Sequence, residues 1–312
     1  MNPEVIKRQI PYCLKETNFN IGTVYHGKVR DNYILDDKRI IITTDRISAF
    51  DRIIGALPFK GEILQSISNF WFSMTDDIID NHILDTPDPN VVIVKNCEVI
   101  PVELIVRRYI TGSLWREYEK GNKNIYGIQF PDNLKKNDKF EEPIVTPTTK
   151  AEHGEHDMPI SPAEIIEKNL VDKNVWEELV DISIKLFKRG EEIAEDRGLV
   201  LVDTKYEFGI YNNKIVLIDE IHTPDSSRYW YKESVINNEF KQLDKEYVRQ
   251  WLIEHNFMGD GPIPELPEDV IVEAVKRYLE IYRTFLKKEP IPYIGNVIER
   301  IEQKLKNYGL LK

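Results

Sequence analysis

The 312-residue sequence has few cysteines, no long apolar segment and a deficit of positive charge. Cys13 and Cys97 are its two cysteines, and they form neither a CxxC pair nor another paired spacing. We therefore expect reduced thiols, no disulfide and a cytoplasmic location, since no apolar signal segment begins the sequence. The longest apolar runs, such as 199–202 and 215–218, are far shorter than the ~20 residues that cross a bilayer. We expect no membrane partner.

The charge balance restricts the class of ligand. The chain carries 42 Lys and Arg against 53 Asp and Glu, a formal net charge of −11. This balance opposes binding to nucleic acid, which needs a basic surface. Any anionic substrate must then be held by a local cluster of cations, because the overall field repels it.

Several nucleotide-binding motifs are also missing. The segment GTVYHGKV from Gly22 approaches a P-loop, but Val29 replaces the required Ser or Thr, and strands are expected to follow. No HRD or DFG motif of protein kinases is present. A glycine turn at Gly27 remains, whose backbone N–H groups and Lys28 side chain could cover phosphates; an exposed surface turn is the alternative.

The patterns that are present predict an α+β protein. From Val24 onward, a strand, the glycine turn, a second strand, a turn at Asp36-Asp37 and a third strand form an antiparallel meander. Residues 91–94 and 101–109 are extended segments joined by a short link, and residues 121–149 are expected to be rich in loops. Helices are expected within 62–83, from the capping box at Ser161, and over 174–196, 244–254, 268–287 and 297–308.

The stretch from Leu201 to Arg228 contains the densest set of acidic residues in a strand pattern. LVDTKYEFGIYNNKIVLIDE alternates apolar and polar residues around an Asn212-Asn213 turn, which predicts a β-hairpin. Glu207 and Asp219 are candidate Mg²⁺ ligands, since carboxylates together with nucleotide phosphates commonly form the magnesium shell. A solvated hairpin with a charged outer face is the alternative interpretation.

Shared metal coordination has a consequence for the hairpin register. With a two-residue turn, Glu207 pairs with Ile218 and Asp219 points to the opposite face. We therefore predict a three-residue loop over Asn212–Lys214 or one bulged residue, either of which would bring Glu207 and Asp219 to the same face.

Other polar clusters are less specific. The segment TDRISAFD supplies Asp45, Arg46, Ser48 and Asp51, a mixed-charge set suited to an amino-acid zwitterion or to ribose hydroxyls, or to a capped turn. His153 and His156 form an HxxH with acidic neighbours, but the HExxH arrangement of zinc enzymes is absent, so we assign them no metal.

Five blocks together resemble the SAICAR synthetase family of purine biosynthesis. The two long blocks are LVDTKYEFG with DEIHTPDSSR (Leu201–Arg228) and IPVELIVRRYITGS (Ile100–Ser113). The shorter blocks are GKVRD at Gly27, TDRISAFD at Thr44 and PTTKAEHGEHD at Pro147. The resemblance covers roughly the first three quarters of the chain.

This resemblance implies a fold and a reaction. The fold would be α+β and two-lobed: an antiparallel lobe with a phosphate-covering loop (1–97), a central α/β lobe resembling kinase and ATP-grasp architectures (98–240), and helices packed on the second lobe (241–312). The enzyme would be an ATP-dependent ligase that joins L-aspartate to the carboxylate of 5-aminoimidazole-4-carboxylate ribotide through an acyl phosphate, with Mg²⁺ as cofactor.

The resemblance also implies roles for individual residues. Lys205 and Lys28 would neutralise charge on the transferred phosphoryl group, and Asp203 would lie toward the substrate carboxylate and could hold a second cation or a water. Arg108 is expected to point away from the site into an ion pair. The binding residues implied are Gly27, Lys28, Arg30, Lys95 and Glu103 for ATP; Arg107, Ser113, Asp225 and Arg228 for the ribotide; Asp45, Ser48, Asp51 and Lys150 for aspartate; and Glu207 and Asp219 for the metal.

Two alternatives remain at this point. A kinase-like phosphotransferase acting on a small molecule or a protein would also need a phosphate-covering turn and metal ligands. A regulatory module that binds ATP without chemistry would not need both an arginine set for a second phosphate and a complete acidic set.

Overall fold

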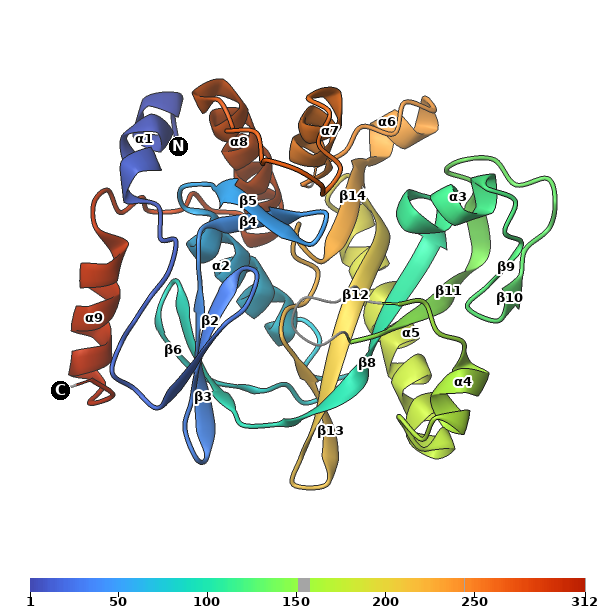
Figure 1. The fold of residues 1–312 in the computed structure, drawn as a ribbon, viewed down its shortest axis with the longest axis horizontal. Helices are drawn as coiled ribbons and strands as arrows, with labels where there is room; N and C mark the ends of the chain where they lie inside the picture. Colours follow the sequence, from blue (N-terminus) through green and yellow to red (C-terminus); the bar gives the residue numbers. More distant parts are fainter. Residues whose placement is uncertain (151–157, 244, 312) are drawn as a thin grey trace.

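The computed structural model describes residues 1–150, 158–243 and 245–311 and contains two five-stranded antiparallel sheets, with helices around them and two further two-stranded sheets (Figure 1). The first sheet has the order β1-β2-β3-β7-β6. Its strands are β1 (Thr23–His26), β2 (Arg30–Ile34), β3 (Lys38–Thr43), β6 (Ile83–Asp88) and β7 (Val91–Lys95). The expected meander is confirmed, with Gly27 between β1 and β2.

The second sheet contains the acidic hairpin, formed by β12 and β13. Its order is β11-β8-β12-β13, and β14 also pairs with β12. The strands are β8 (Glu98–Tyr109), β11 (Lys139–Thr149), β12 (Leu199–Tyr211), β13 (Lys214–Ile218) and β14 (Ser227–Tyr231). Every strand pair of this sheet is antiparallel.

A short link joins the two sheets. β7 ends at Lys95 in the first sheet, and β8 begins at Glu98 in the second, so Asn96 and Cys97 span the crossing. The expected link between two extended segments is confirmed.

The sequence predicted a loop-rich segment over 121–149. This holds for 121–138, where only β9 (Asn124–Ile125) and β10 (Ile128–Gln129) interrupt the loops, and is wrong for β11. Pro143 and Pro147 interrupt the strand pattern, and proline is tolerated in sheets mainly on edge strands. β11 is such an edge strand, paired with β8 alone, and its register shifts between Lys139 and Ile144.

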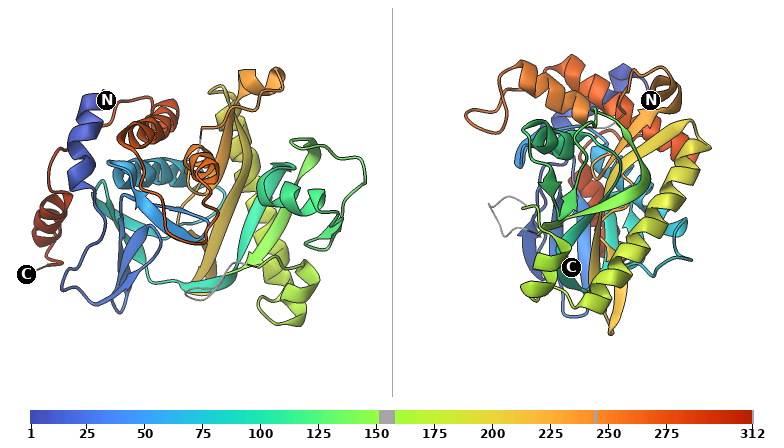
Figure 2. Two further views of the ribbon diagram at one scale, coloured as in Figure 1. Left: turned by 45° about the horizontal axis from the view of Figure 1, so that its top comes forward. Right: turned by 90° about the vertical axis from the view of Figure 1, so that its right-hand side faces the viewer.

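The three longest helices, α2 (Lys60–Ser73), α5 (Lys173–Glu195) and α8 (Glu268–Leu286), contribute most of the helical part of the large core. α5 packs on β12 and runs along the second sheet (Figure 2), and its buried stripe includes Leu179, Leu186 and Phe187. α2 packs against α8, where Trp71 and Phe285 are in edge contact. These helices and the second sheet share one continuous apolar cluster.

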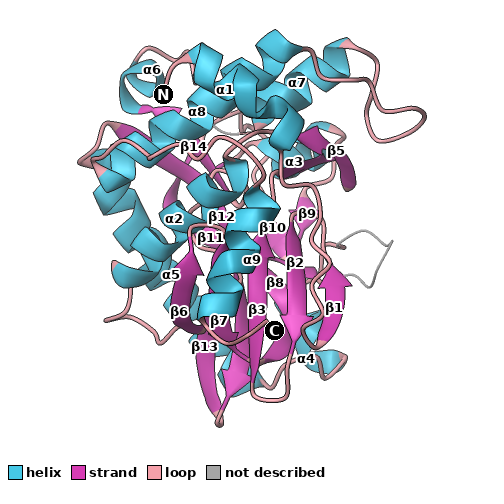
Figure 3. Cartoon of the chain, turned by 90° about the vertical axis from the view of Figure 1, so that its left-hand side faces the viewer, coloured by secondary structure: helices cyan, strands magenta, loops and turns pink. Residues whose placement is uncertain are grey.

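α9 (Val297–Asn307) does not follow the expectation that the C-terminal helices pack on the second lobe. It lies over the first sheet (Figure 3), where Val297, Ile301 and Leu305 pack with Tyr33 and Ile40. Its apolar side chains recur at intervals of four residues, which gives one stripe that a sheet can cover.

The remaining elements are short. They are α1 (Pro3–Gln9), a 3₁₀ turn (Ile10–Tyr12), α3 (Gly112–Glu119), α4 (Pro162–Glu167), α6 (Lys232–Ile236), α7 (Glu246–Glu254), β4 (Arg46–Ala49), β5 (Arg52–Ala56), β9 (Asn124–Ile125) and β10 (Ile128–Gln129). The capping box at Ser161 is present at the start of α4. Within the three described ranges, every helix is too short or too polar to cross a bilayer.

Candidate active site

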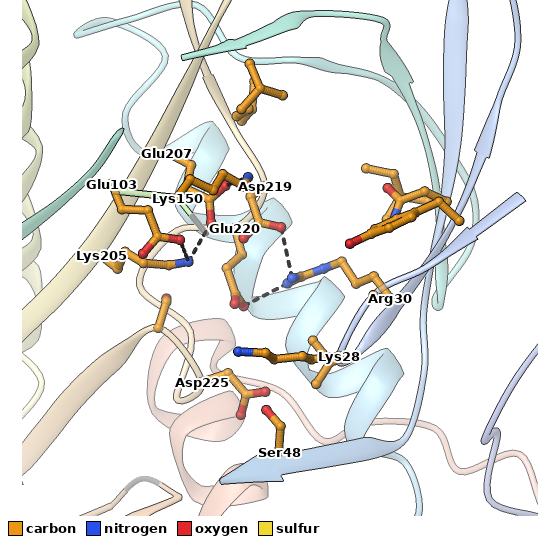
Figure 4. Close-up of a pocket in the computed structure, with 18 of the residues that line it drawn as sticks. Lys28, Arg30, Ser48, Glu103, Lys150, Lys205, Glu207, Asp219, Glu220 and Asp225 are labelled. Carbon is orange, nitrogen blue, oxygen red and sulfur yellow. Dashed lines mark hydrogen bonds and ion pairs between the residues drawn. The ribbon is translucent and has the colours of Figure 1, made fainter. Parts of the chain in front are cut away.

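A cavity of about 620 Å³ opens between the first sheet and the second. At one end it is mainly apolar; the apolar side chains that line it include Ile34, Ile41, Val94, Cys97, Val99 and Ile218. Its other end is charged, with lysine, arginine and carboxylate side chains drawn from both sheets (Figure 4). An apolar slot beside a charged wall suits a ligand with a flat ring and anionic groups.

Lys205 bridges two carboxylates on neighbouring strands. Glu103 of β8 and Glu207 of β12 are direct partners in the ladder, and Lys205 Nζ donates to both, at 2.7 and 2.5 Å. Burial acts to lower the pKa of Lys205, but Glu207 and Glu103 raise it well above its ordinary value. The lysine is therefore a permanent positive charge in the wall of the cavity.

Glu207 also pairs with Lys150, which follows β11. Burial acts to raise the pKa of Glu207, but the ammonium groups of Lys205 and Lys150 outweigh it and hold this pKa well below its usual range. Glu207 is thus ionised at neutral pH, the state that a metal ligand needs.

Asp219 follows the end of β13 and faces the same cavity. Arg30 Nη1 donates to Asp219 at 2.9 Å, and Arg30 Nη2 lies 2.8 Å from Glu220. Burial raises the pKa of Asp219 to about 6; the Arg30 guanidinium opposes this rise, and the nearby charge of Glu207 reinforces it. Arg30, from β2, therefore ties the first sheet to the acidic segment of the second.

The predicted irregular hairpin is wrong. β12 and β13 form a regular ladder in which Tyr211 pairs with Lys214 and Glu207 with Ile218. Asn212 and Asn213 both have positive φ, 51° and 61°, which suits a two-residue hairpin turn. The chain leaves the ladder one residue later instead, where Asp219 adopts a left-handed φ of 63°, and Asp219 and Glu207 line the same cavity (Figure 4).

A second cavity, of about 210 Å³, contains the arginine set. Arg107, Ser113, Asp203 and Arg228 line it, and it shares Lys205, Asp225, Ser226, Lys245 and Arg249 with the first cavity. These shared side chains make the two cavities neighbouring parts of one cleft.

Asp203 holds the two arginines of the second cavity. Its Oδ2 accepts from Arg107 Nη1 at 3.0 Å and from Arg228 Nη1 at 2.6 Å, and ladder pairs place all three residues side by side. Arg107 Nη2 also donates to Ser113 Oγ at 3.3 Å. These contacts favour a role for Asp203 in orienting guanidinium groups over the expected role as a holder of a second cation.

Arg108 points the other way, as expected. Its Nε and Nη2 donate to Glu191 of α5 at 2.7 and 2.6 Å, outside both cavities. Adjacent residues on a strand face opposite sides, so Arg107 and Arg108 have separate environments.

Asp225 lines both cavities and is engaged by two buried groups. Its Oδ2 accepts from Lys60 Nζ at 2.7 Å, and its Oδ1 accepts from Tyr278 Oη at 2.6 Å. Burial acts to raise the pKa of Asp225, but Lys60 and Lys245 outweigh it and lower this pKa.

The glycine turn lies at the mouth of the larger cavity. Lys28 Nζ lies 2.5 Å from Asp51, and both side chains are about half exposed. The buried Arg46 donates to the carbonyl oxygens of Gly27 and Lys28 and to Asp31, which fixes the turn from behind. Ser48, Asp51 and Lys95 line the same cavity, and Lys95 Nζ donates to the carbonyl oxygen of Asn81.

Asp45 does not face the cleft, so its expected role in binding aspartate is wrong. It is 2% exposed, and its carboxylate accepts from the backbone N–H groups of Leu14 and Gly61 at 2.8 and 2.9 Å. Burial raises its pKa to about 6. Asp45 thus joins the chain before β1 to the start of α2.

Comparison with known proteins decides the family. The SAICAR synthetase family model matches residues 23–262. The phosphoribosylaminoimidazole-succinocarboxamide synthase of Legionella pneumophila (strain Paris) is 47% identical over 284 residues, which cover 88% of this chain and 90% of that protein. The chain belongs to the SAICAR synthetase family.

Two further relatives extend this match. The synthase of Bacteroides thetaiotaomicron is 45% identical over 95% of this chain and 98% of its own length. A solved SAICAR synthase from Saccharomyces cerevisiae, complexed with SAICAR, superposes with a TM-score of 0.78 at 32% identity and covers 89% of this chain. The similarity to SAICAR synthetases therefore extends over nearly the whole chain, including the C-terminal region.

Several cleft residues were absent from the sequence prediction. Glu220, Lys245 and Arg249 line the larger cavity, and Lys60 pairs with Asp225 beneath it. Lys245 and Arg249 are spaced by four residues at the start of α7, a spacing that puts both on one helical face and could have indicated a basic patch. Lys60 offers no such signal, because its burial depends on how α2 docks.

The HxxH at His153 and His156 lies outside the described residues. Within residues 1–150, 158–243 and 245–311, no group of three or more His, Cys, Asp or Glu side chains is arranged to hold a metal ion by itself.

Proposed function

We propose that this cleft joins L-aspartate to the carboxylate of 5-aminoimidazole-4-carboxylate ribotide at the expense of ATP, giving SAICAR. Membership of the SAICAR synthetase family makes the chain an ATP-dependent carboxylate–amine ligase of purine biosynthesis. The arrangement of side chains in the cleft supports this assignment of the site. Its paired carboxylates and lysines lie beside an apolar slot, and an arginine pair lies next to them.

The larger cavity suits ATP. Its apolar end, beside the link at Asn96-Cys97, has the chemistry that an adenine ring needs, with Lys95 at its edge. The turn at Gly27 and Lys28 would cover the phosphates, with Arg30 as a further cation. Glu103 is placed to accept from a ribose hydroxyl or, as its contact with Lys205 favours, to hold that lysine.

Glu207 and Asp219 fit a magnesium site. Both face the same cavity and lie near Lys150 and Lys205, which now balance their charge. Two carboxylates leave the other magnesium ligands to nucleotide phosphate oxygens and water, a common arrangement for Mg²⁺ with ATP. When bound, the ion would neutralise negative charge on the phosphates.

The smaller cavity suits the 5′-phosphate of the ribotide. Arg107 and Arg228 present guanidinium groups side by side, and Ser113 adds a hydroxyl donor. Guanidinium groups match phosphate oxygens in pairs. Asp225, Lys245 and Arg249 lie where the two cavities meet, so they would line the path between the ribotide and ATP.

The chemistry follows from the poor reactivity of a carboxylate. A ribotide carboxylate oxygen attacks the γ-phosphorus of ATP, ADP departs, and an acyl phosphate forms. The amine of aspartate then attacks the acyl carbon, the C–N bond forms, and inorganic phosphate leaves with a proton lost from the amine. Lys205 and Lys28 would neutralise the charge that develops on the phosphoryl oxygens, and no protein nucleophile is needed.

Aspartate is the least constrained substrate. Ser48, Asp51 and Lys150 all line the larger cavity, and we assign them to the aspartate side of the cleft. Lys150 would supply the positive charge that a dicarboxylate requires. In this proposal, residues 1–97 would cover the nucleotide, and residues 98–240 would hold the metal and the ribotide. The two free cysteines are compatible with a cytoplasmic enzyme.

A coupled assay for ADP release tests the function. With ATP, Mg²⁺ and the ribotide present, ADP should form rapidly only when L-aspartate is added. Equal ADP formation without aspartate would indicate a kinase-like phosphotransferase. Nucleotide binding without ADP formation under any combination of substrates would indicate a regulatory module.

A further inference from the structure

We infer that the buried hydrogen bond between Tyr206 and His222 positions Asp219 relative to Glu207 and so sets the affinity of the metal site. Tyr206 Oη and His222 Nε2 are 2.5 Å apart, and both side chains are fully buried. Neither residue lines the cleft, and this inference rests on the proposed magnesium site.

The two residues lie directly behind the carboxylates. Tyr206 stands between Lys205 and Glu207 on β12, and successive side chains of a strand point to opposite faces. Its ring therefore enters the core while its two neighbours face the cleft. His222 is three residues after Asp219, on the segment that leaves the ladder.

That segment needs support from outside the sheet. The last ladder pair of the hairpin is Glu207 with Ile218, so no strand pairing fixes Asp219. Asp219 and His222 both have left-handed backbones, with φ of 63° and 52°, a conformation that is strained for most non-glycine residues and that Asp and His adopt more readily than most. The Tyr206–His222 bond joins this segment back to β12 at the residue beside Glu207.

The surroundings of His222 leave its ring little freedom. The Trp71 ring lies edge-on at 4.5 Å between centroids, and Tyr229 Oη donates to the His222 carbonyl oxygen at 2.8 Å. Gly190 of α5 lies so close that any side chain there would overlap the imidazole. The ring is therefore a fixed point to which the segment after Asp219 is attached.

The test measures how strongly Mg²⁺ improves ADP binding. The dissociation constant of ADP is determined by calorimetry in EDTA and again in excess Mg²⁺, for the whole chain and for Tyr206→Phe, which removes one hydroxyl. We expect the improvement by Mg²⁺ to fall about tenfold in the variant, as for other groups that orient metal ligands. Binding of ADP in EDTA should stay within about twofold, since Tyr206 does not line the nucleotide cavity.

Two further variants separate positioning from general damage. Tyr33→Phe removes another fully buried phenol hydroxyl. Tyr33 lies in β2 of the first sheet and its hydroxyl donates to Thr17, so this variant should leave the magnesium effect unchanged. His222→Phe removes the same bond from its other side, and the double variant with Tyr206→Phe should be no worse than either single change.

The results for the unaltered chain and for the variants distinguish a failure of the proposed metal site from a failure of this inference. No magnesium effect in the unaltered chain would overturn the proposed metal site and this inference with it. A normal effect in the unaltered chain that persists in Tyr206→Phe and His222→Phe would overturn the inference alone. Equal weakening of ADP binding with and without Mg²⁺, or additive effects in the double variant, would also overturn it.

Discussion

Glu103 and Glu207 lie directly opposite each other on β8 and β12, and Lys205 Nζ bonds both carboxylates. Like charges that face each other across strands destabilise a sheet, so the lysine offsets a repulsion inside the wall of the cleft. The same ammonium group is available to a phosphoryl group that enters the cavity.

Lys205→Met should lower turnover by about a hundredfold, because the variant loses a preorganised charge aimed at the developing negative charge. It should also unfold at lower temperature, since Glu103 and Glu207 are left facing each other. Steady-state ADP release and thermal unfolding check these results. Lys185→Met is the control. Lys185 forms an exposed ion pair with Asp181, so this variant should change neither the turnover nor the unfolding temperature.

Arg228→Ala should weaken ribotide binding by about ten- to a hundredfold and leave ATP binding nearly intact, because a phosphate contact with a guanidinium contributes a few kcal/mol. Calorimetry with each ligand separates the two effects. Arg108→Ala, whose arginine pairs with Glu191 away from the cleft, should leave both affinities unchanged. Equal losses for ribotide and ATP in Arg228→Ala would contradict the assignment of Arg228.

Lys28→Ala should raise the Michaelis constant for ATP or lower its turnover, with ribotide binding preserved, since the glycine turn faces only the larger cavity. Lys214→Ala is a matched control, because Lys214 is an exposed lysine next to the Asn212-Asn213 turn of the β12–β13 hairpin. Unchanged kinetics with ATP in Lys28→Ala would leave Lys28 as a surface residue that pairs with Asp51.

Glu62 makes stability depend on pH. Burial raises the pKa of Glu62 to about 7 from an ordinary 4.5, although Arg300 Nη1 at 3.3 Å opposes the rise. The folded chain therefore keeps this proton to higher pH than the unfolded chain, and its stability falls as the pH rises from about 4.5 to 7.

Glu62→Gln removes that dependence. The free energy of unfolding of the variant, relative to that of the unaltered chain, should increase by roughly 2 kcal/mol as the pH rises through this window. Urea unfolding at several pH values measures it. A difference that stays constant or shrinks with rising pH would show that Glu62 is ionised at little cost in the folded chain.

Much of the fold could be predicted because the residues that determine many of its helices, strands and turns lie close together in the sequence. The alternation around Lys205, the glycine turn at Gly27 and the stripe of α5 each depend on a short window of sequence, and each element formed as predicted. The edge strand β11 was missed because its prolines are tolerated only in a tertiary setting that a window does not contain.

The cleft residues likewise divide into those that local patterns place correctly and those whose positions depend on tertiary contacts. Residues on predicted strands, such as Arg107 and Glu207, reach it by strand alternation. Asp45 leaves it because its carboxylate meets backbone N–H groups from two distant segments. Asp219 reaches it through a left-handed backbone conformation just after the ladder ends, so counting along the hairpin put it on the wrong face.

In the proposed reaction, the cleft activates the ribotide carboxylate by phosphorylation before aspartate attacks. The most direct test supplies ribotide labelled with ¹⁸O in its carboxylate, together with ATP, Mg²⁺ and L-aspartate, and analyses the inorganic phosphate by mass spectrometry. We predict that one ¹⁸O atom appears in each phosphate released. Phosphate free of ¹⁸O, formed together with SAICAR, would rule out phosphorylation of the ribotide carboxylate.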